Sequence, residues 1–318
     1  MNTITEKSLI NTYGVSNENT VAMNSTKAEN MAFMDDTAAI LNLSEDAFGD
    51  GVVTVKSTDA TTMSTRISNQ SYQSMLSDLK LYSGPIDGNM SSSLSTKAIK
   101  NFQRVYGLEQ TGALNSATST KLEDVYDFYC NTLRDSDMTN LKNTLFPVGE
   151  RITSGLANIL TNNLALTWTF LNKGMGLSEV QAAGAMGNIM HESFFSPTNA
   201  NDEYNNGQYD DIQDSDYNFE TDTTNEVAYG LIQWKFYSRR DDLEEVADNM
   251  GLNVGDINAQ FACIRYESET SYSSAWSNLR LSNSVANATQ IFKDQYEQCD
   301  DDTLAIRTNY ANIINNAL

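Results

Sequence analysis

The chain has 318 residues, 40% of them apolar, which is enough for packed cores in two or three domains. No stretch approaches the roughly 18 apolar residues of a membrane helix, and residues 1–10 lack the layout of a signal peptide, so we expect neither membrane insertion nor a cleaved leader. The net charge is −22, and residues 151–318 hold 24 Asp and Glu against 9 Lys and Arg. Such a surface repels phosphate backbones, which excludes a nucleic acid partner.

Cysteine and histidine usage argues against metal or cofactor chemistry. Cys130, Cys263 and Cys299 are widely spaced and form no disulfide or metal pattern, so we interpret them as buried small hydrophobes. The single histidine, His191, cannot supply the two or three ligands typical of catalytic zinc. A Cys–His peptidase would need one of the cysteines beside His191, and none has a recognisable neighbouring motif.

Residues 1–66 are rich in Ser, Thr, Asn and Asp and carry no recognisable chemistry. We predict an N-terminal adaptor or partly disordered region here, because such a composition buries little apolar surface.

Residues 67–130 show three helical patterns. The first contains apolar residues from Tyr72 to Leu79, and turns follow near Gly84 and Gly88. A second amphipathic helix runs from Leu94 to Phe102, and Ala117 to Leu122 indicates a short third helix. Three small helices around one compact core are expected.

The same residues resemble the peptidoglycan-binding domain found on many cell wall hydrolases. The resemblance rests on four motifs, namely Gly84-Pro85-Ile86-Asp87-Gly88, Ala98-Ile99-Lys100-Asn101-Phe102-Gln103, Gly107-Leu108 and Thr111-Gly112. It implies that this domain binds bacterial peptidoglycan. Most of the motif is expected to be scaffold, with Phe102 and Leu108 in the core.

Residues 131–150 are predicted to be a linker, because Pro147 and Gly149 interrupt helical periodicity. Residues 151–318 form the second large region. Leu156 to Leu171 predicts a helix, and Ser178 is a suitable N-cap for the next one. The small residues of that next helix allow close packing against a neighbour; they are Ala182, Ala183, Gly184, Ala185 and Gly187.

Glu192 is a carboxylate at the end of this apolar helix. Burial raises the pKa of a Glu and makes it a proton donor, as in glycosidases. An acidic, turn-rich segment from Asp202 to Glu226 follows and leads to Tyr229-Gly230-Leu231-Ile232-Gln233-Trp234. This order resembles the layout of lysozyme-like muramidases and lytic transglycosylases, which implies a cleft with the acid on one wall and amide and aromatic groups on the other.

These residues resemble the phage tail lysozyme family, muramidases carried on virion tails. The resemblance includes Gly174-Met175-Gly176-Leu177-Ser178, Ala183 to Asn188, Glu192-Ser193, Tyr229 to Trp234, Asn258-Ala259-Gln260-Phe261 and Tyr266-Glu267. It implies a mainly α fold with an α+β lysozyme-like catalytic domain. It also implies that Glu192 is the catalytic acid acting on the bond between N-acetylmuramic acid and N-acetylglucosamine. Candidate sugar contacts are His191, Ser193, Tyr229, Gln233 and Trp234, although Trp234 also suits a core position.

No sequence motif identifies the second carboxylate that would act together with Glu192. Glu226 is the acid nearest the Gly-Leu-Ile-Gln turn and is our first choice, with Asp222 and Asp216 as alternatives. A calcium loop at Asp214 to Asn218 is not favoured, since Phe219 stands where an EF-hand needs Gly.

Three functions remain open at this point. The favoured one is a peptidoglycan hydrolase in a virion tail or released to the cell wall. The alternatives are a lytic transglycosylase with the same acid and a non-enzymatic wall-binding or tail-structural protein.

Overall fold

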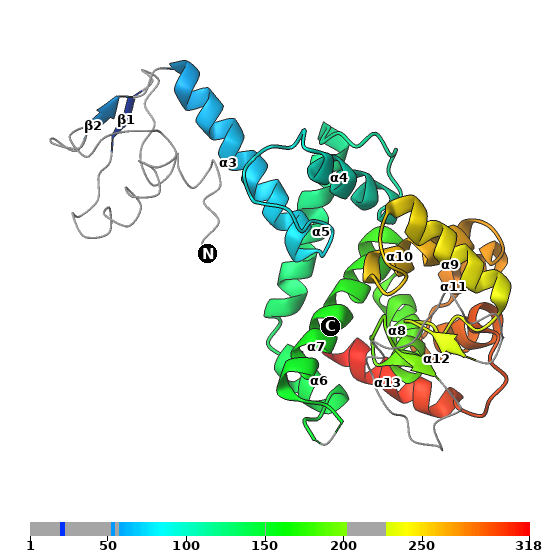
Figure 1. Ribbon diagram of the computed structural model, residues 1–318. Coiled ribbons are helices and arrows are strands. Elements are labelled where there is room, and N and C mark those ends of the chain that lie inside the picture. Colours follow the sequence, from blue (N-terminus) through cyan, green and yellow to red (C-terminus); the bar gives the residue numbers. More distant parts are fainter. Residues whose placement is uncertain (1–19, 23–51, 55–56, 150, 202–226) are drawn as a thin grey trace. The chain divides into compact units, whose positions relative to one another are not determined.

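The structure is a computed structural model that describes residues 20–22, 52–54, 57–149, 151–201 and 227–318 (Figure 1). It is mainly helical, as the sequence predicted. The chain divides into two compact units, the first of residues 1–75 and 84–95 and the second of residues 76–83 and 96–318. No helix in the described ranges has the length and apolar character of a membrane-spanning segment.

The first unit contains an antiparallel strand pair and the first part of a long helix. Strands β1 (Thr20–Ala22) and β2 (Val52–Thr54) pair with each other, and helix α3 (Ser57–Asp78) starts upstream of the helix that the sequence predicted. Gln73 organises the turn that follows α3. Its Oε1 accepts from the Gly88 N–H at 2.7 Å, and its Nε2 donates to Asp87 Oδ1 at 3.0 Å. Gly88 has a φ of +78°, which explains the glycine in this motif.

The second unit begins with the end of α3, helix α4 (Ser93–Val105) and helix α5 (Ser116–Arg134). They share the expected three-helix core, formed by Leu76, Leu79, Ala98, Ile99, Phe102, Leu122 and Val125. Helix α5 is not the short helix that we predicted. Its buried face continues past Leu122 through Val125 and Tyr129, and this spacing keeps the helix regular up to Arg134. Helix α6 (Met138–Leu145) follows inside the predicted linker and buries Leu141 and Leu145.

Polar side chains of α10 contact the end of α4 and the residues that follow α3 within the same unit. Arg265 donates from Nε to Val105 O at 2.9 Å and from Nη2 to Gly174 O at 2.6 Å. Asn258 Nδ2 lies 3.2 Å from Leu79 O. These contacts satisfy carbonyl groups at or just beyond helix ends, which have no partner within the helix. Helix α4 and helix α10 are therefore held together within the second unit.

The rest of the second unit is a helical assembly around α8. Its elements are α7 (Ser154–Thr169), a π-helical segment (Phe170–Gly174), α8 (Glu179–Ser193), β3 (Ala200–Asn201), β4 (Ala228–Tyr229), α9 (Tyr237–Met250), α10 (Ile257–Glu269), α11 (Ser273–Leu281), α12 (Val285–Ile291), a second π-helical segment (Phe292–Glu297) and α13 (Leu304–Ala317). Helix α8 lies beside α12 and α13 (Figure 1). Strands β3 and β4 pair with each other.

Glycines allow α8 to approach its neighbours closely, as the small-residue pattern predicted. A side chain at Gly184 would collide with Ala288 and Thr289 of α12. At Gly187 it would collide with the Arg307 carbonyl and with Ala311 of α13. The close contact at Gly187 brings Arg307 alongside the last turn of α8.

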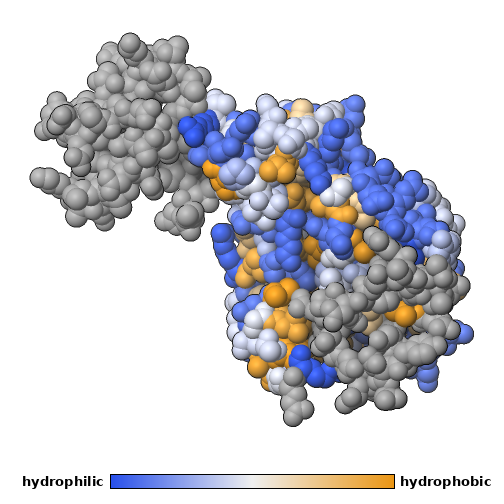
Figure 2. Space-filling view, viewed as in Figure 1, coloured by the Kyte–Doolittle hydropathy of each residue, from blue (hydrophilic) through white to orange (hydrophobic). Residues whose placement is uncertain are grey.

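The burial of the three cysteines agrees only partly with the prediction. Cys263 is buried, as predicted, whereas Cys130 and Cys299 are half-buried. Cys130 falls between the buried positions of α5, and Cys299 follows the second π-helical segment, so neither lies on a core face. On the surface, hydrophilic side chains gather over α9 (Figure 2), where the sequence places Asp241, Asp242, Glu244, Glu245 and Asp248.

Candidate active site

Glu192 lies in the last turn of α8, immediately before a strained turn of the chain. Ser178 is the N-cap of α8, as predicted, and its N–H donates to Gln181 Oε1 at 3.0 Å. Phe194 and Phe195 both adopt left-handed conformations, with φ of 55° and 61°. Such residues cost about 1–3 kcal/mol each and persist where packing imposes them, often at functional sites.

Packing holds this turn in place. The Phe195 ring is fully buried and meets Phe146 edge to face, with 6.4 Å between ring centroids. Asn163 Nδ2 donates to the Phe195 carbonyl at 2.9 Å. The direction of the chain after Glu192 is therefore fixed by buried contacts.

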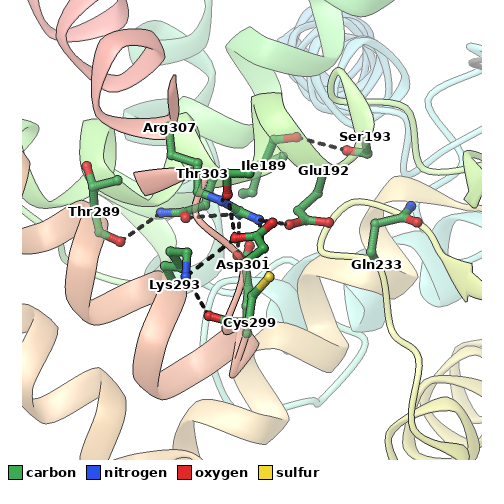
Figure 3. A network of polar contacts seen from close by, with 12 residues as sticks. Ile189, Glu192, Ser193, Gln233, Thr289, Lys293, Cys299, Asp301, Thr303 and Arg307 are labelled. Carbon is green, nitrogen blue, oxygen red and sulfur yellow. Dashed lines mark hydrogen bonds and ion pairs between the residues drawn. The ribbon is translucent and has the colours of Figure 1, made fainter. Parts of the chain in front are cut away.

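The Glu192 carboxyl group contacts a buried arginine from the C-terminal helix. Its Oε1 accepts a hydrogen bond from Arg307 Nη2 (Figure 3). The Arg307 side chain is fully buried, whereas the Glu192 side chain is 18% exposed. The acid is thus mostly desolvated but still open to a ligand on one side.

Arg307 is shared among three carboxyl groups. Its Nη1 donates to Glu297 Oε2 at 2.7 Å, and its Nη2 lies 3.6 Å from Asp301 Oδ2. Lys293 Nζ lies 3.4 Å from Asp301 Oδ1 and adds a second positive charge. These three carboxyl groups face two cations, so full ionisation would leave excess negative charge in a desolvated site. That excess favours retention of a proton by one of the acids.

The acids of this cluster have different proton affinities. Burial raises the pKa of Glu192, and the charge of Asp301 adds to the effect, while Arg307 and Lys293 oppose it. Burial also raises the pKa of Glu297, whose Oε1 has no hydrogen-bond partner among the described residues. For Asp301, burial is outweighed by hydrogen bonds from Thr303 and Cys299 and by the charge of Arg307, which together lower its pKa to about 2. A protonated Glu192 beside an ionised Asp301 suits acid catalysis.

The second predicted motif forms a closed turn beside α8. Tyr229 and Trp234 exchange two backbone hydrogen bonds, of 3.2 and 2.9 Å. Gly230, with a φ of +80°, lies against the side chain of Gln260, whose Oε1 accepts from the Leu231 N–H at 2.9 Å. Ser193 Oγ donates to the Leu231 carbonyl at 2.9 Å and so ties the turn to the end of α8.

Most of the predicted sugar contacts are buried. Ser193 and Trp234 have no exposed surface, and Tyr229 and Gln233 are 5% and 8% exposed. Ser193 therefore links two backbone segments, and Trp234 packs in the core while its Nε1 donates to Glu267 Oε2 at 3.3 Å.

Gln233 is held in an unusual conformation. Its φ is +54°, its Nε2 donates to Gly230 O at 2.9 Å, and its Oε1 is buried without a partner among the described residues. In Figure 3 the Glu192 carboxyl is drawn between Gln233 and Arg307. An unpaired buried oxygen is costly, which makes this amide a candidate for ligand binding.

The structure describes His191 but does not describe the candidates for the second carboxylate. His191 is half-buried, and burial followed by the charge of Arg307 lowers its pKa, so it is neutral near pH 7. Glu226, its alternatives Asp222 and Asp216, and the segment compared with a calcium loop lie outside the described residues. Their roles stay predictions.

Comparison with protein families agrees with the two resemblances. Residues 162–318 match the phage tail lysozyme family, and residues 70–122 match the peptidoglycan binding domain family. The chain joins a peptidoglycan-binding domain to a phage tail lysozyme domain. Searches of curated proteins and of solved structures found no match. The two domains support a lysozyme-like peptidoglycan hydrolase function, with peptidoglycan as partner.

Sequence reasoning missed the residues that surround the acid of the lysozyme domain. Arg307, Glu297 and Asp301 lie more than 100 positions after Glu192 and belong to no motif that we identified. One feature of the sequence could have drawn attention to Arg307. Arg307 is a charged residue on the apolar face of α13, the same kind of signal that drew attention to Glu192.

Proposed function

We propose that the lysozyme domain is a muramidase that cleaves the bond between N-acetylmuramic acid and N-acetylglucosamine, with Glu192 as general acid. The observation that carries this proposal is the position of Glu192, a mostly buried but accessible carboxyl group at the end of α8 in a lysozyme family domain. Burial raises its pKa and keeps it protonated at a higher pH than a free Glu.

The reaction begins with proton transfer from Glu192 to the glycosidic oxygen. The bond from this oxygen to C1 of muramic acid breaks, and positive charge develops on C1 in a transition state of oxocarbenium character. A second group must stabilise this charge or attack C1. From sequence alone, Glu226 is our first choice for that group. If the 6-hydroxyl group of the sugar attacked instead of water, the product would be the 1,6-anhydro sugar of a transglycosylase.

The binding domain keeps the enzyme on its insoluble substrate. Attachment to the wall raises the local concentration of the catalytic domain around the glycan strands. We place the protein on a virion tail, where residues 1–66 would bind tail proteins, or at the bacterial wall after release as an endolysin. The name of the matching family supports the first location.

Cysteine chemistry has little support. A nucleophilic cysteine requires a thiolate, which a lowered pKa provides. Burial raises the pKa of both Cys263 and Cys299, so neither thiol is activated.

The test compares clearing of a cell wall suspension by the wild type and by Glu192→Gln. We expect the variant to be about 100-fold to 10,000-fold slower, the usual range for loss of a general acid. Glu179→Gln, at the exposed start of the same helix, is the matched control and should clear at the wild-type rate. Equal clearing by Glu192→Gln would rule out the acid assignment. Absence of clearing by the wild type would favour the non-enzymatic alternative, and mass spectrometry would distinguish hydrolysis from anhydro products.

A further inference from the structure

Two of the three carboxyl groups around Arg307 reach the surface of the protein. The Glu192 side chain is 18% exposed and the Asp301 side chain 40%, whereas Glu297 is 3% exposed. Only an exposed carboxyl can touch a glycan strand. Within this cluster, Asp301 is therefore the acid that can act on substrate together with Glu192.

Glu192 and Asp301 also lie close to each other. Glu192 Oε1 and Asp301 Oδ2 approach the same nitrogen, Arg307 Nη2 (Figure 3). Two oxygens that share one nitrogen are nearer than the separation of about 6.5 Å at which inverting glycosidases begin. The arrangement fits retaining enzymes, in which the second carboxylate attacks the sugar directly.

The two oxygens of Asp301 have different surroundings. Oδ1 accepts from Thr303 Oγ1 at 2.6 Å and lies 3.4 Å from Lys293 Nζ. Oδ2 lies 3.6 Å from Arg307 Nη2, and the Cys299 thiol also contacts this carboxyl group. Thr303 and Lys293 thus hold the side chain through Oδ1, while Oδ2 lies toward the Arg307 nitrogen that Glu192 also contacts. The pKa of Asp301 is lowered to about 2 and that of Glu192 is raised, so there is a range of pH in which Asp301 is ionised and Glu192 is protonated.

We propose that Asp301 is the second carboxylate of the lysozyme domain and acts as its nucleophile. The inference rests on the proposed function, since it needs Glu192 as the acid. It assigns to the loop between the second π-helical segment and α13 a role that the sequence suggested for Glu226.

The reaction then has two balanced steps. Asp301 Oδ2 forms a bond to C1 of muramic acid while the bond from C1 to the glycosidic oxygen breaks, and the proton of Glu192 goes to that oxygen. Water next attacks C1 and gives a proton to the Glu192 carboxylate, while the bond from C1 to Asp301 breaks. Glu192 ends protonated and Asp301 ionised, and the sugar keeps its configuration.

The test is removal of the carboxylate followed by chemical rescue. We expect Asp301→Ala to hydrolyse soluble glycan fragments at least about 100-fold more slowly than the wild type. Sodium azide should restore cleavage by the variant, because azide fits the vacated space and attacks C1. The product should be a glycosyl azide, which mass spectrometry detects. A merely structural role of Asp301 would not yield this product. Asp302→Ala, in the same loop, is the matched control.

Three outcomes would overturn the assignment. Asp301→Ala could retain wild-type turnover, or it could lose turnover while folded and give no azide product. Glu226→Ala could give the glycosyl azide instead, which would make Glu226 the nucleophile. Failure of the proposed function is distinguishable, because in that case Glu192→Gln would remain as active as the wild type.

Discussion

Two buried arginines in the second unit, Arg239 and Arg307, both pair with carboxyl groups, but their networks differ in the number of carboxyl groups and in how these are exposed. Arg239 forms a closed pair with Glu267, with Nε to Oε1 at 2.6 Å and Nη2 to Oε2 at 2.9 Å. Tyr296 OH also donates to Glu267 Oε2, at 2.6 Å, and Tyr272 places its ring 4.5 Å from the guanidinium. Both charged side chains are buried, and both carboxylate oxygens have donors.

Arg307 instead contacts three acids, of which Glu297 has an oxygen without a partner among the described residues and Glu192 and Asp301 are partly exposed. A fully satisfied buried network fixes one conformation. A network with surplus carboxyl groups shifts proton affinities, which is the property of an active site. We therefore expect Arg239 to stabilise the fold and Arg307 to adjust the proton affinity of Glu192.

The largest effect on stability is expected at the closed pair. Glu267→Gln leaves Arg239 charged and buried without its counter-ion, and should lower the free energy of unfolding by about 3–5 kcal/mol. Urea denaturation measures this change. Glu269→Gln, which alters an exposed pair with Arg265, should cost no more than about 1 kcal/mol. Similar losses in both variants would contradict the structural role of Glu267.

A smaller loss is expected for Arg307→Met, of about 1–3 kcal/mol, because Glu192 can turn toward solvent and Glu297 can take up a proton. This variant also has a pH signature. Arg307 lowers the pKa of Glu192, so its removal raises that pKa further. In the proposed mechanism Glu192 acts in its protonated form, so the fall of activity at high pH should move to higher pH. A pH profile of residual wall clearing tests this, and an unchanged profile would separate Arg307 from the acid.

The smallest effect on stability is expected for Glu192→Gln, within about 1 kcal/mol, because it removes one surplus carboxyl and keeps a hydrogen-bond acceptor for Arg307. The sign of the stability difference between this variant and the wild type depends on pH. A raised pKa means that Glu192 favours the folded state below its ordinary value of 4.5 and that this contribution is lost as pH rises through the folded value. The stability of the Gln variant relative to the wild type should therefore increase with pH above 4.5. Thermal unfolding across this range measures the trend, and a decrease would mean that Arg307 dominates and lowers the pKa.

The local features of this protein could be predicted from its sequence. Helical spacing placed α4 and the start of α5, Ser178 marked the start of α8, and the motif at Gly84 to Gly88 identified the binding domain. Glu192 stood out because a carboxylate in an apolar helix is costly, and that cost is visible in one dimension. Gly184 and Gly187 predicted close packing of α8 for a similar reason, since only small residues permit it.

The partners of Glu192 were decided by tertiary structure alone. Arg307, Glu297 and Asp301 reach Glu192 only because α8 and α13 pack at Gly187, and nothing in their local sequence encodes that distance. Proton affinity depends on burial and on charges a few ångströms away, so two carboxyl groups near one arginine differ, with a raised pKa for Glu192 in α8 and a lowered pKa for Asp301 before α13. Spacing along a chain cannot specify such an environment, whereas packing in three dimensions creates it.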